Sequence, residues 1–156
     1  MFVISCNSVN NKSNAIIEYY PDQKIKIMTI ENSGGENLQI SFDDDGNIKL
    51  MQKKKDSTND GQSIWFYDDG VIQNTLIFNN GKASGNGFWF YNDGAIKSHG
   101  YWKNDMLSGY ATNYYQDSIG TLKNIVFYDD NGKVSWQKES NHSLGISISR
   151  DSLNKH

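Results

Sequence analysis

The sequence predicts an all-β protein, an elongated antiparallel meander of about five stacked β-hairpin repeats in a single twisted sheet. Three observations lead to this prediction: a spacing of 24 residues between equivalent glycines, aromatic residues with the same spacing, and turn-forming dipeptides in each period. A period of roughly 20 to 50 residues is typical of arrays in which each unit buries its apolar surface against its neighbours. We therefore expect one continuous domain.

The glycines define the period. Two columns keep it, Gly46, Gly70 and Gly94 in the first and Gly61, Gly85 and Gly109 in the second. Aromatic residues keep the same spacing, and these are Trp65 and Trp89, then Tyr67, Tyr91 and Tyr115. Because ring size recurs together with glycine, we expect equivalent packing in successive units.

Each period contains two turn signals. Asp-Gly pairs such as Asp69-Gly70 are typical of two-residue type I′ hairpin loops, in which both central residues have positive φ. A second signal, such as Asn80-Gly81, lies between successive Asp-Gly pairs. Each unit is therefore expected to be a β-hairpin with a turn at either end.

A two-residue loop at Asp69-Gly70 predicts the cross-strand pairs. Tyr67 then lies opposite Ile72, and Gly61 lies opposite Phe78. By the same count Gly85 lies opposite Trp102, so we expect each ring to lie over backbone that carries no Cβ.

This register separates two faces. The first, which we interpret as structural, carries Trp65, Tyr67, Ile72, Leu76, Phe78, Gly85, Gly87, Trp89, Tyr91, Ile96, Gly100 and Trp102. The second is unusually apolar for an exposed face, with Ile64, Phe66, Ile77, Phe88, Phe90 and Tyr101 beside Gln73, Lys97 and His99. Such a strip predicts a cover, which could be a terminal segment, a second copy of the chain or a partner. Rings that simply cover neighbouring backbone are an equal alternative.

The chain divides into three segments on this interpretation. Residues 15–140 form the repeat domain, beginning with a degenerate unit. Residues 141–156 form a C-terminal edge strand or tail, because Leu144, Ile146 and Ile148 alternate with small polar residues. Residues 1–14 are read as a truncated signal and flexible tether.

The reason lies in Val3-Ile4-Ser5-Cys6, which resembles the lipobox of bacterial lipoproteins. The resemblance implies lipidation of Cys6 and attachment of the protein to a membrane, with Asn7 to Asn14 as the tether. Only five residues precede the cysteine, whereas a signal needs an apolar core of about 7 to 15 residues. Either the start lies upstream, or Cys6 is a thiol near a chain end.

The repeats themselves resemble a known family. Trp65 to Gly70, Phe88 to Gly94 with Ile96-Lys97, and Tyr101 to Asn104 followed by Gly109-Tyr110 are similar to MORN repeats of the bacterial variant. The resemblance covers roughly residues 18–138. It implies stacked β-hairpins, and it says little about function, since such proteins are labelled antitoxin components or act as scaffolds.

Composition and charge exclude several classes of function. With 15 Lys and Arg against 18 Asp and Glu, the net charge of −3 argues against nucleic acid. The single cysteine and three scattered histidines predict neither a metal site nor a cofactor. Paired aspartates occur at turns, where they serve folding, so we expect no catalytic site.

We therefore expect a non-enzymatic binding or scaffold module, tethered to a bacterial membrane, that presents aromatic side chains to a protein, peptide or glycan. The expected contacts are Phe66, Phe88, Phe90, Tyr101 and Tyr110, and a homodimer is possible. The alternative is a cytoplasmic antitoxin-like protein that neutralises a toxin by binding it.

Overall fold

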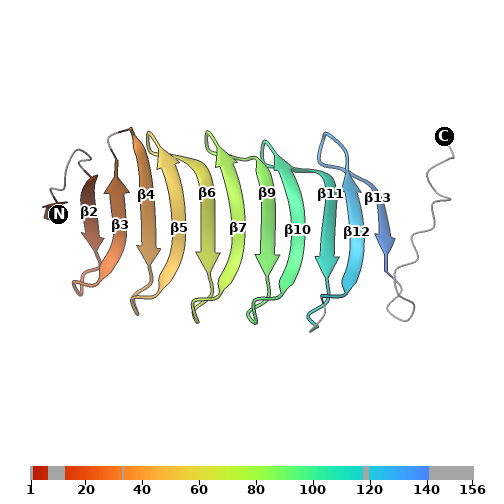
Figure 1. The fold of residues 1–156 in the computed structure, drawn as a ribbon, viewed down its shortest axis with the longest axis horizontal. Coiled ribbons are helices and arrows are strands. Elements are labelled where there is room, and N and C mark those ends of the chain that lie inside the picture. The colour runs from red at the N-terminus through yellow and green to blue at the C-terminus, as the bar shows by residue number, and fades with distance from the viewer. Residues whose placement is uncertain (1, 7–12, 33, 118–119, 141–156) are drawn as a thin grey trace.

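The computed structural model describes residues 2–6, 13–32, 34–117 and 120–140. These residues form thirteen β-strands and no helix, and all the strands belong to one antiparallel sheet (Figure 1). Twelve strands follow one another in chain order across the sheet, and the short β8 pairs with β7 beside this path. The predicted all-β meander is confirmed.

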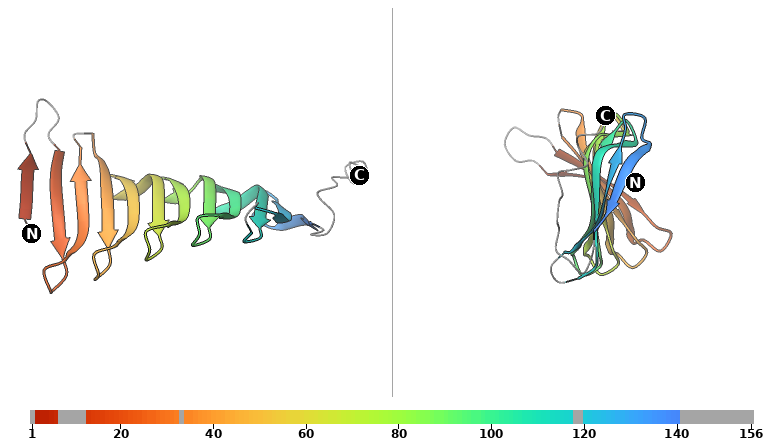
Figure 2. Two further views of the ribbon diagram at one scale, coloured as in Figure 1. Left: turned by 60° about the horizontal axis from the view of Figure 1, so that its bottom comes forward. Right: turned by 90° about the vertical axis from the view of Figure 1, so that its right-hand side faces the viewer.

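The strands are short, as expected for hairpin repeats. Their bounds are β1 Phe2–Cys6, β2 Ser13–Tyr19, β3 Ile25–Glu31, β4 Glu36–Phe42, β5 Ile48–Lys55, β6 Thr58–Phe66, β7 Ile72–Asn79, β8 Lys82–Ala83, β9 Gly85–Phe90, β10 Ile96–Lys103, β11 Met106–Tyr114, β12 Leu122–Tyr128 and β13 Val134–Glu139. Successive strands rotate about the long axis of the sheet, which is visible when the molecule is viewed along that axis (Figure 2).

The loops along one long edge of the sheet differ from the predicted type I′ turns. Tyr67 N donates to Val71 O at 2.8 Å, and Gly70 N donates to Tyr67 O at 3.0 Å. Gly70 has a φ of 83°, whereas Asp69 is not among the residues with positive φ. The loop is therefore a type I turn followed by a left-handed glycine, which contains one residue more than a type I′ loop.

This extra residue also corrects a predicted pair. Ile72 lies opposite Phe66 instead of Tyr67, so Ile72 and its counterpart Ile96, which pairs with Phe90, lie on the face opposite to the one predicted. The register shift between Trp65 and Phe66 offsets the extra loop residue, so the predicted pairs farther from the loop are kept. The carboxylate of Asp69 accepts the amide of Val71 at 3.1 Å, which stabilises the observed turn.

Type I′ geometry occurs along the opposite long edge. Asn80-Gly81 has φ values of 48° and 81°, and Asn104-Asp105 has values of 50° and 70°. These two-residue loops are the second turn signal of each repeat. Asparagine and aspartate tolerate positive φ better than other residues with a side chain.

The second glycine column has a different role from the one predicted. Gly61 lies opposite Phe78 and Gly85 opposite Trp102, as expected. However, a Cβ at Gly85 would meet Ile77 at 3.1 Å, and not the Trp102 ring. Gly61, Gly85 and Gly109 share positive φ values of 99°, 127° and 73°. The backbone conformation therefore requires glycine in this column.

Tyrosine hydroxyls tie successive repeats together. Tyr67 Oη donates to Phe90 O at 2.8 Å, and Tyr91 Oη donates to Tyr114 O at 2.9 Å. In the first repeat Tyr20 Oη donates to Phe42 O at 2.8 Å. Asp43 occupies the equivalent position of the next repeat, and its carboxylate accepts the amides of its own turn.

The structural face predicted from the sequence contains most of the buried side chains, and we call it the packed face. It is formed by Gln52, Ser63, Trp65, Leu76, Gly87, Trp89, Gly100, Trp102, Ala111 and Val126. Most of its central row is buried, including Ser63 at 0% exposure, and Leu76 in the same row is half-buried. A Cβ at Gly87 would lie 2.9 Å from both Leu76 and the ring of Trp89. Large side chains therefore lie directly over small residues.

Candidate functional site: the aromatic face

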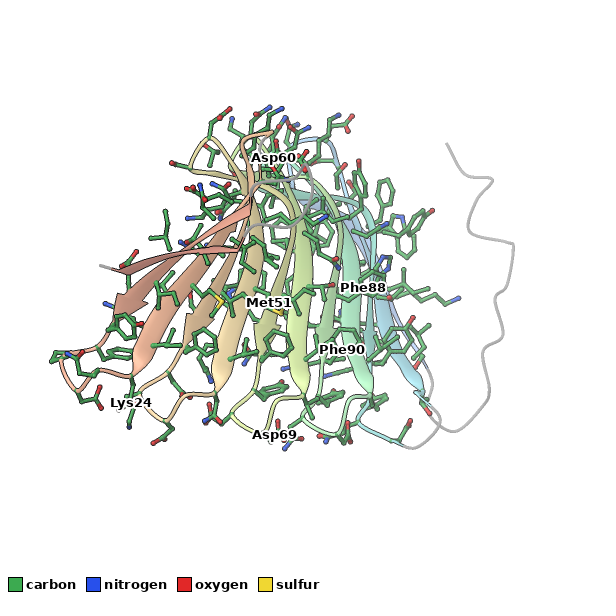
Figure 3. The ribbon with its side chains drawn as sticks, turned by 60° about the vertical axis from the view of Figure 1, so that its left-hand side comes forward. Lys24, Met51, Asp60, Asp69, Phe88 and Phe90 are labelled. Carbon is green, nitrogen blue, oxygen red and sulfur yellow. The ribbon has the colours of Figure 1, made fainter. Side chains whose placement is uncertain are left out.

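The opposite face of the sheet is the candidate functional site, and we call it the aromatic face. It is formed in its C-terminal half by Phe66, Ile77, Phe88, Phe90, His99, Tyr101, Tyr110, Phe127 and Trp136. Directly opposed residues of antiparallel strands share a face, so the strand register places these side chains together. Figure 3 shows Phe88 at mid-strand and Phe90 nearer the row of loops that contains Asp69.

Three rings from neighbouring strands form a cluster at the C-terminal end of this face. Tyr110 lies on β11, Phe127 on β12 and Trp136 on β13. The ring centroids of Tyr110 and Phe127 are 5.0 Å apart, and those of Phe127 and Trp136 are 6.3 Å apart with the planes nearly parallel at 8°. Tyr110 is 57% exposed and Trp136 is 43% exposed, so the cluster faces solvent.

A second aromatic contact lies beside this cluster. The rings of Phe88 and His99 are stacked with centroids 4.5 Å apart. The imidazole Nε2 lies 3.3 Å from Asn86 Oδ1. Tyr101 is 47% exposed on the same strand as His99.

The structure thus brings together the five predicted contact residues on one face, although their exposure differs. Tyr101 and Tyr110 are exposed, whereas Phe66, Phe88 and Phe90 are half-buried. Phe127 and Trp136 are additional members that the sequence reasoning missed. Their signal was the alternation of Ile125 with Phe127, which was obscured because the loop before β12 is longer than the equivalent loops.

The central row of the same face is aliphatic in the N-terminal half, where Tyr19 and Phe42 are the aromatic residues beside it. In that half the row contains Ile17, Met28, Ile40, Met51 and Ile64, related by successive cross-strand pairs. Of these, Ile17 is buried and the others are half-buried. Aromatic rings are therefore concentrated in the C-terminal half, where Tyr and Trp can bury a large area with few rotatable bonds.

The packed face contains one open hollow. Its volume is about 230 Å3, and its lining includes Trp89, Ser98, Trp102, Asn113 and Tyr128. The rings of Trp89 and Trp102 are tilted, with centroids 6.0 Å apart, and Trp102 Nε1 is buried without a hydrogen-bond partner. The side-chain amide of Asn113 donates to Asn124 Oδ1 at 2.7 Å, so it is already used in a hydrogen bond between β11 and β12.

The aspartates at the loops act as hydrogen-bond acceptors. The backbone amide of Asn47 lowers the pKa of Asp43 below its usual value of 3.8. The backbone amide of Ala95, helped by the side chain of Gln116, likewise lowers the pKa of Asp93. Among the described residues, no group of three or more His, Cys, Asp or Glu could hold a metal ion. These carboxylates therefore have a structural explanation.

Cys6 is the last residue of β1 and lies opposite Ser13 on β2. Cleavage before Cys6 would remove Phe2 to Ser5 and leave β2 as the first strand. Of the expected tether at residues 7–14, residues 7–12 lie outside the described residues, and Ser13 and Asn14 belong to β2 instead of to a tether. The expected edge strand at residues 141–156 also lies outside the described residues. The described part of the chain contains no helix capable of crossing a membrane.

Comparisons with known proteins add little to this geometry. No protein-family model and no curated protein matches the sequence. A solved structure of a TarM mutant from S. aureus, in complex with fondaparinux, alpha-GlcNAc-glycerol and UDP, is similar with a TM-score of 0.45 and 12% identity over 68% of this chain. A second TarM structure has a TM-score of 0.40 and 12% identity over 66% of this chain. The chain spans 21% of the length of each of these structures, and at these scores neither supports an argument about this protein.

Proposed function

We propose that this protein is a non-enzymatic binding module that engages a protein or peptide partner through the C-terminal half of the aromatic face. One observation carries the proposal. Tyr101, Tyr110 and Trp136 expose 47%, 57% and 43% of their surface on one face, and two of them belong to a single ring cluster. Exposed aromatic clusters are uncommon on a surface that serves stability alone, and Tyr and Trp dominate the energetics of protein interfaces.

The rigidity of the site supports this proposal. Phe127 stacks on Trp136 and packs edge-on against Tyr110, so the cluster is ordered before a partner arrives. The strands beneath it are fixed by sheet hydrogen bonds. Binding would therefore cost little conformational entropy.

The non-enzymatic part of the proposal has separate support. The carboxylates with a lowered pKa accept amides at turns, where each repeat uses them for folding. The 24-residue period and the tyrosine bonds between repeats support our further proposal that the units are of the MORN type.

We also propose that Cys6 anchors the protein to a bacterial membrane. The lipobox-like Val3 to Cys6 supports this, and it requires that β1 is removed on maturation. Labelling of cells with palmitate, together with the mass of the mature protein, tests it. An unlabelled chain that retains Phe2 would overturn the anchor and make the cytoplasmic alternative the better one.

The test of binding uses a matched pair of variants. Full-length protein is used to capture partners from native membranes, in parallel with a Tyr101→Ala/Tyr110→Ala variant and a Tyr19→Ala control. Tyr19 is 38% exposed and lies on β2, at the other end of the sheet. The amount of a specific partner that is captured should fall at least tenfold with the double variant and should stay unchanged with the control. Equal capture by all three proteins would contradict the proposal.

A further inference from the structure

The last described strand, β13, leaves one side of its backbone open. Its inner side pairs with β12, and Ser140 N, which follows the strand, donates to Lys123 O at 2.8 Å. In antiparallel pairing, backbone groups point alternately toward and away from the neighbour. Trp136 and Lys138 therefore turn their N–H and C=O groups toward β12, and Gln137 and Glu139 turn theirs outward.

Nothing among the described residues pairs with these outward groups. All six residues of β13 are exposed, including Val134 at 54% and Trp136 at 43%. Figure 1 shows β13 at the C-terminal end of the row of strands. An edge of this kind is a template for strand addition. The register shift beside Ser135 places a bulge in the first half of β13, whereas Trp136 to Glu139 contain neither a bulge nor a proline.

The side chains of β13 select among the possible ways to pair with an identical strand. In a two-fold antiparallel pair, only outward-facing residues can share hydrogen bonds. A two-fold axis at Lys138 places two lysines opposite each other, which is unfavourable. An axis at Gln137 instead places Lys138 of each copy opposite Trp136 of the other.

With the axis at Gln137, the side chains on both faces of the sheet also make acceptable contacts. Trp136 and Lys138 lie on the aromatic face, so each ammonium reaches the exposed indole of the other copy as a cation–π pair. Glu139 of each copy then comes near Ser135 of the other, at the bulge of β13, so no like charges meet. The stack of Phe127 on Trp136 would then continue into the second copy.

We propose that two copies of the chain join edge to edge through β13, with a two-fold axis at Gln137, so that their sheets form one continuous sheet. This goes beyond the proposed binding function, which does not depend on it. The occupant of the edge is a second copy, because its register pairs the outward backbone groups of Gln137, places Lys138 over Trp136 and opposes no like charges.

Proline at position 137 tests the interface directly. Since the N–H of Gln137 points outward, Gln137→Pro removes a donor to the second copy and keeps every bond to β12. Gln137→Ala keeps that donor and is the matched control. Sedimentation of the full chain should show a species of twice the monomer mass of 17.7 kDa for the wild type and for Gln137→Ala. Gln137→Pro should weaken association at least tenfold while its circular dichroism stays unchanged.

Cysteine cross-linking tests the register. Hydrogen-bonded antiparallel pairs have Cα atoms about 5.5 Å apart, which a disulfide can bridge. In a Cys6→Ser background, Gln137→Cys should therefore form a covalent dimer on mild oxidation, and Glu139→Cys should not.

Four outcomes overturn the proposal. They are a wild-type monomer at high micromolar concentration, a dimer that Gln137→Pro leaves intact, cross-linking through Glu139→Cys in preference to Gln137→Cys, and a full-length monomer that dimerises only after removal of residues 141–156. The last outcome would assign the edge to the chain's own C-terminal segment. None of these measurements uses the Tyr101 and Tyr110 variants, so failure here and failure of the binding proposal are distinguishable.

Discussion

The two faces of this sheet are formed by the same repeat, yet only the packed face has a central row of mostly buried residues. The central row of the packed face contains several small residues, such as Ser63, Gly87 and Ala111, and large side chains beside Gly87 lie over it. The central row of the aromatic face contains larger residues, among them Phe88 and His99. Rings beside that row have no small residue to cover, so they extend into solvent. In the C-terminal half of the sheet, small residues at mid-strand therefore leave room for neighbouring side chains on the packed face, and the aromatic face offers no such room.

The strongest test of this comparison is to enlarge a small residue of the packed face. Gly87→Val places a Cβ 2.9 Å from Leu76 and from the Trp89 ring, so it overpacks the row. We expect a loss of about 2 kcal/mol in the free energy of unfolding, measured by urea denaturation.

The control is Thr75→Val, which adds a methyl group in place of a hydroxyl on the half-buried aromatic face. Its effect should stay within about 0.5 kcal/mol. If both substitutions cost the same, the two faces do not differ in the way described.

A smaller effect is expected from the tyrosines that link repeats. Tyr91→Phe removes the donor to Tyr114 O and should cost about 1 kcal/mol of unfolding free energy. Tyr110→Phe, on the exposed aromatic face, removes a hydroxyl that has no hydrogen-bond partner within the described part of the chain, and it should be neutral. Thermal denaturation followed by circular dichroism compares the two variants, and equal losses would contradict a structural role specific to Tyr91.

Truncation of an exposed ring should change stability less again. Tyr101→Ala is expected to alter the free energy of unfolding by about 0.5 kcal/mol or less, because the ring is nearly half exposed. A cooperative loss of several kcal/mol would show that this side chain belongs to the core, and the proposed binding surface would then be wrong.

The smallest effect concerns the loops that join the faces. The pKa of Asp43 is lowered in the folded state by the backbone amide of Asn47, so the ionised form stabilises the fold. That contribution is present above the usual value of 3.8 and is lost as the pH falls through the lower folded value. Asp43→Asn should therefore reduce the dependence of stability on pH below this value, measured by urea denaturation at several acidic pH values. An unchanged dependence would exclude Asp43 as a contributor.

Much of this fold could be predicted because the repeat determines it several times over. The pairs Gly61 with Phe78 and Gly85 with Trp102 follow from the period and from counting across the loops. The type of loop at Asp69-Gly70 could not be deduced in this way. An Asp-Gly pair fits both candidate loops, and the bond from Val71 to the Asp69 carboxylate, which favours the longer one, exists only in the folded chain.

The candidate site was predicted less completely than the fold. Phe88 and Phe90 were placed on the correct face because they lie in the regular repeats. Phe127 and Trp136 follow the longer loop before β12, where the period of 24 no longer applies. The tyrosine bonds were also missed, because their acceptors are carbonyl groups that the sequence does not distinguish.

Asp43 occupies the position at which other repeats have a linking tyrosine, so one junction between repeats is expected to be weaker than the others. Hydroxyl bonds fasten Tyr20 to Phe42 and Tyr67 to Phe90, but the segment between Phe42 and Phe66 has no equivalent fastening. The exposed ion pair of Lys49 with Asp68 crosses this junction, and an exposed pair contributes little. We expect the N-terminal strands up to β5 to unfold together, before the C-terminal repeats unfold. Hydrogen exchange of backbone amides should therefore be faster in β2 to β5 than in β6 to β11.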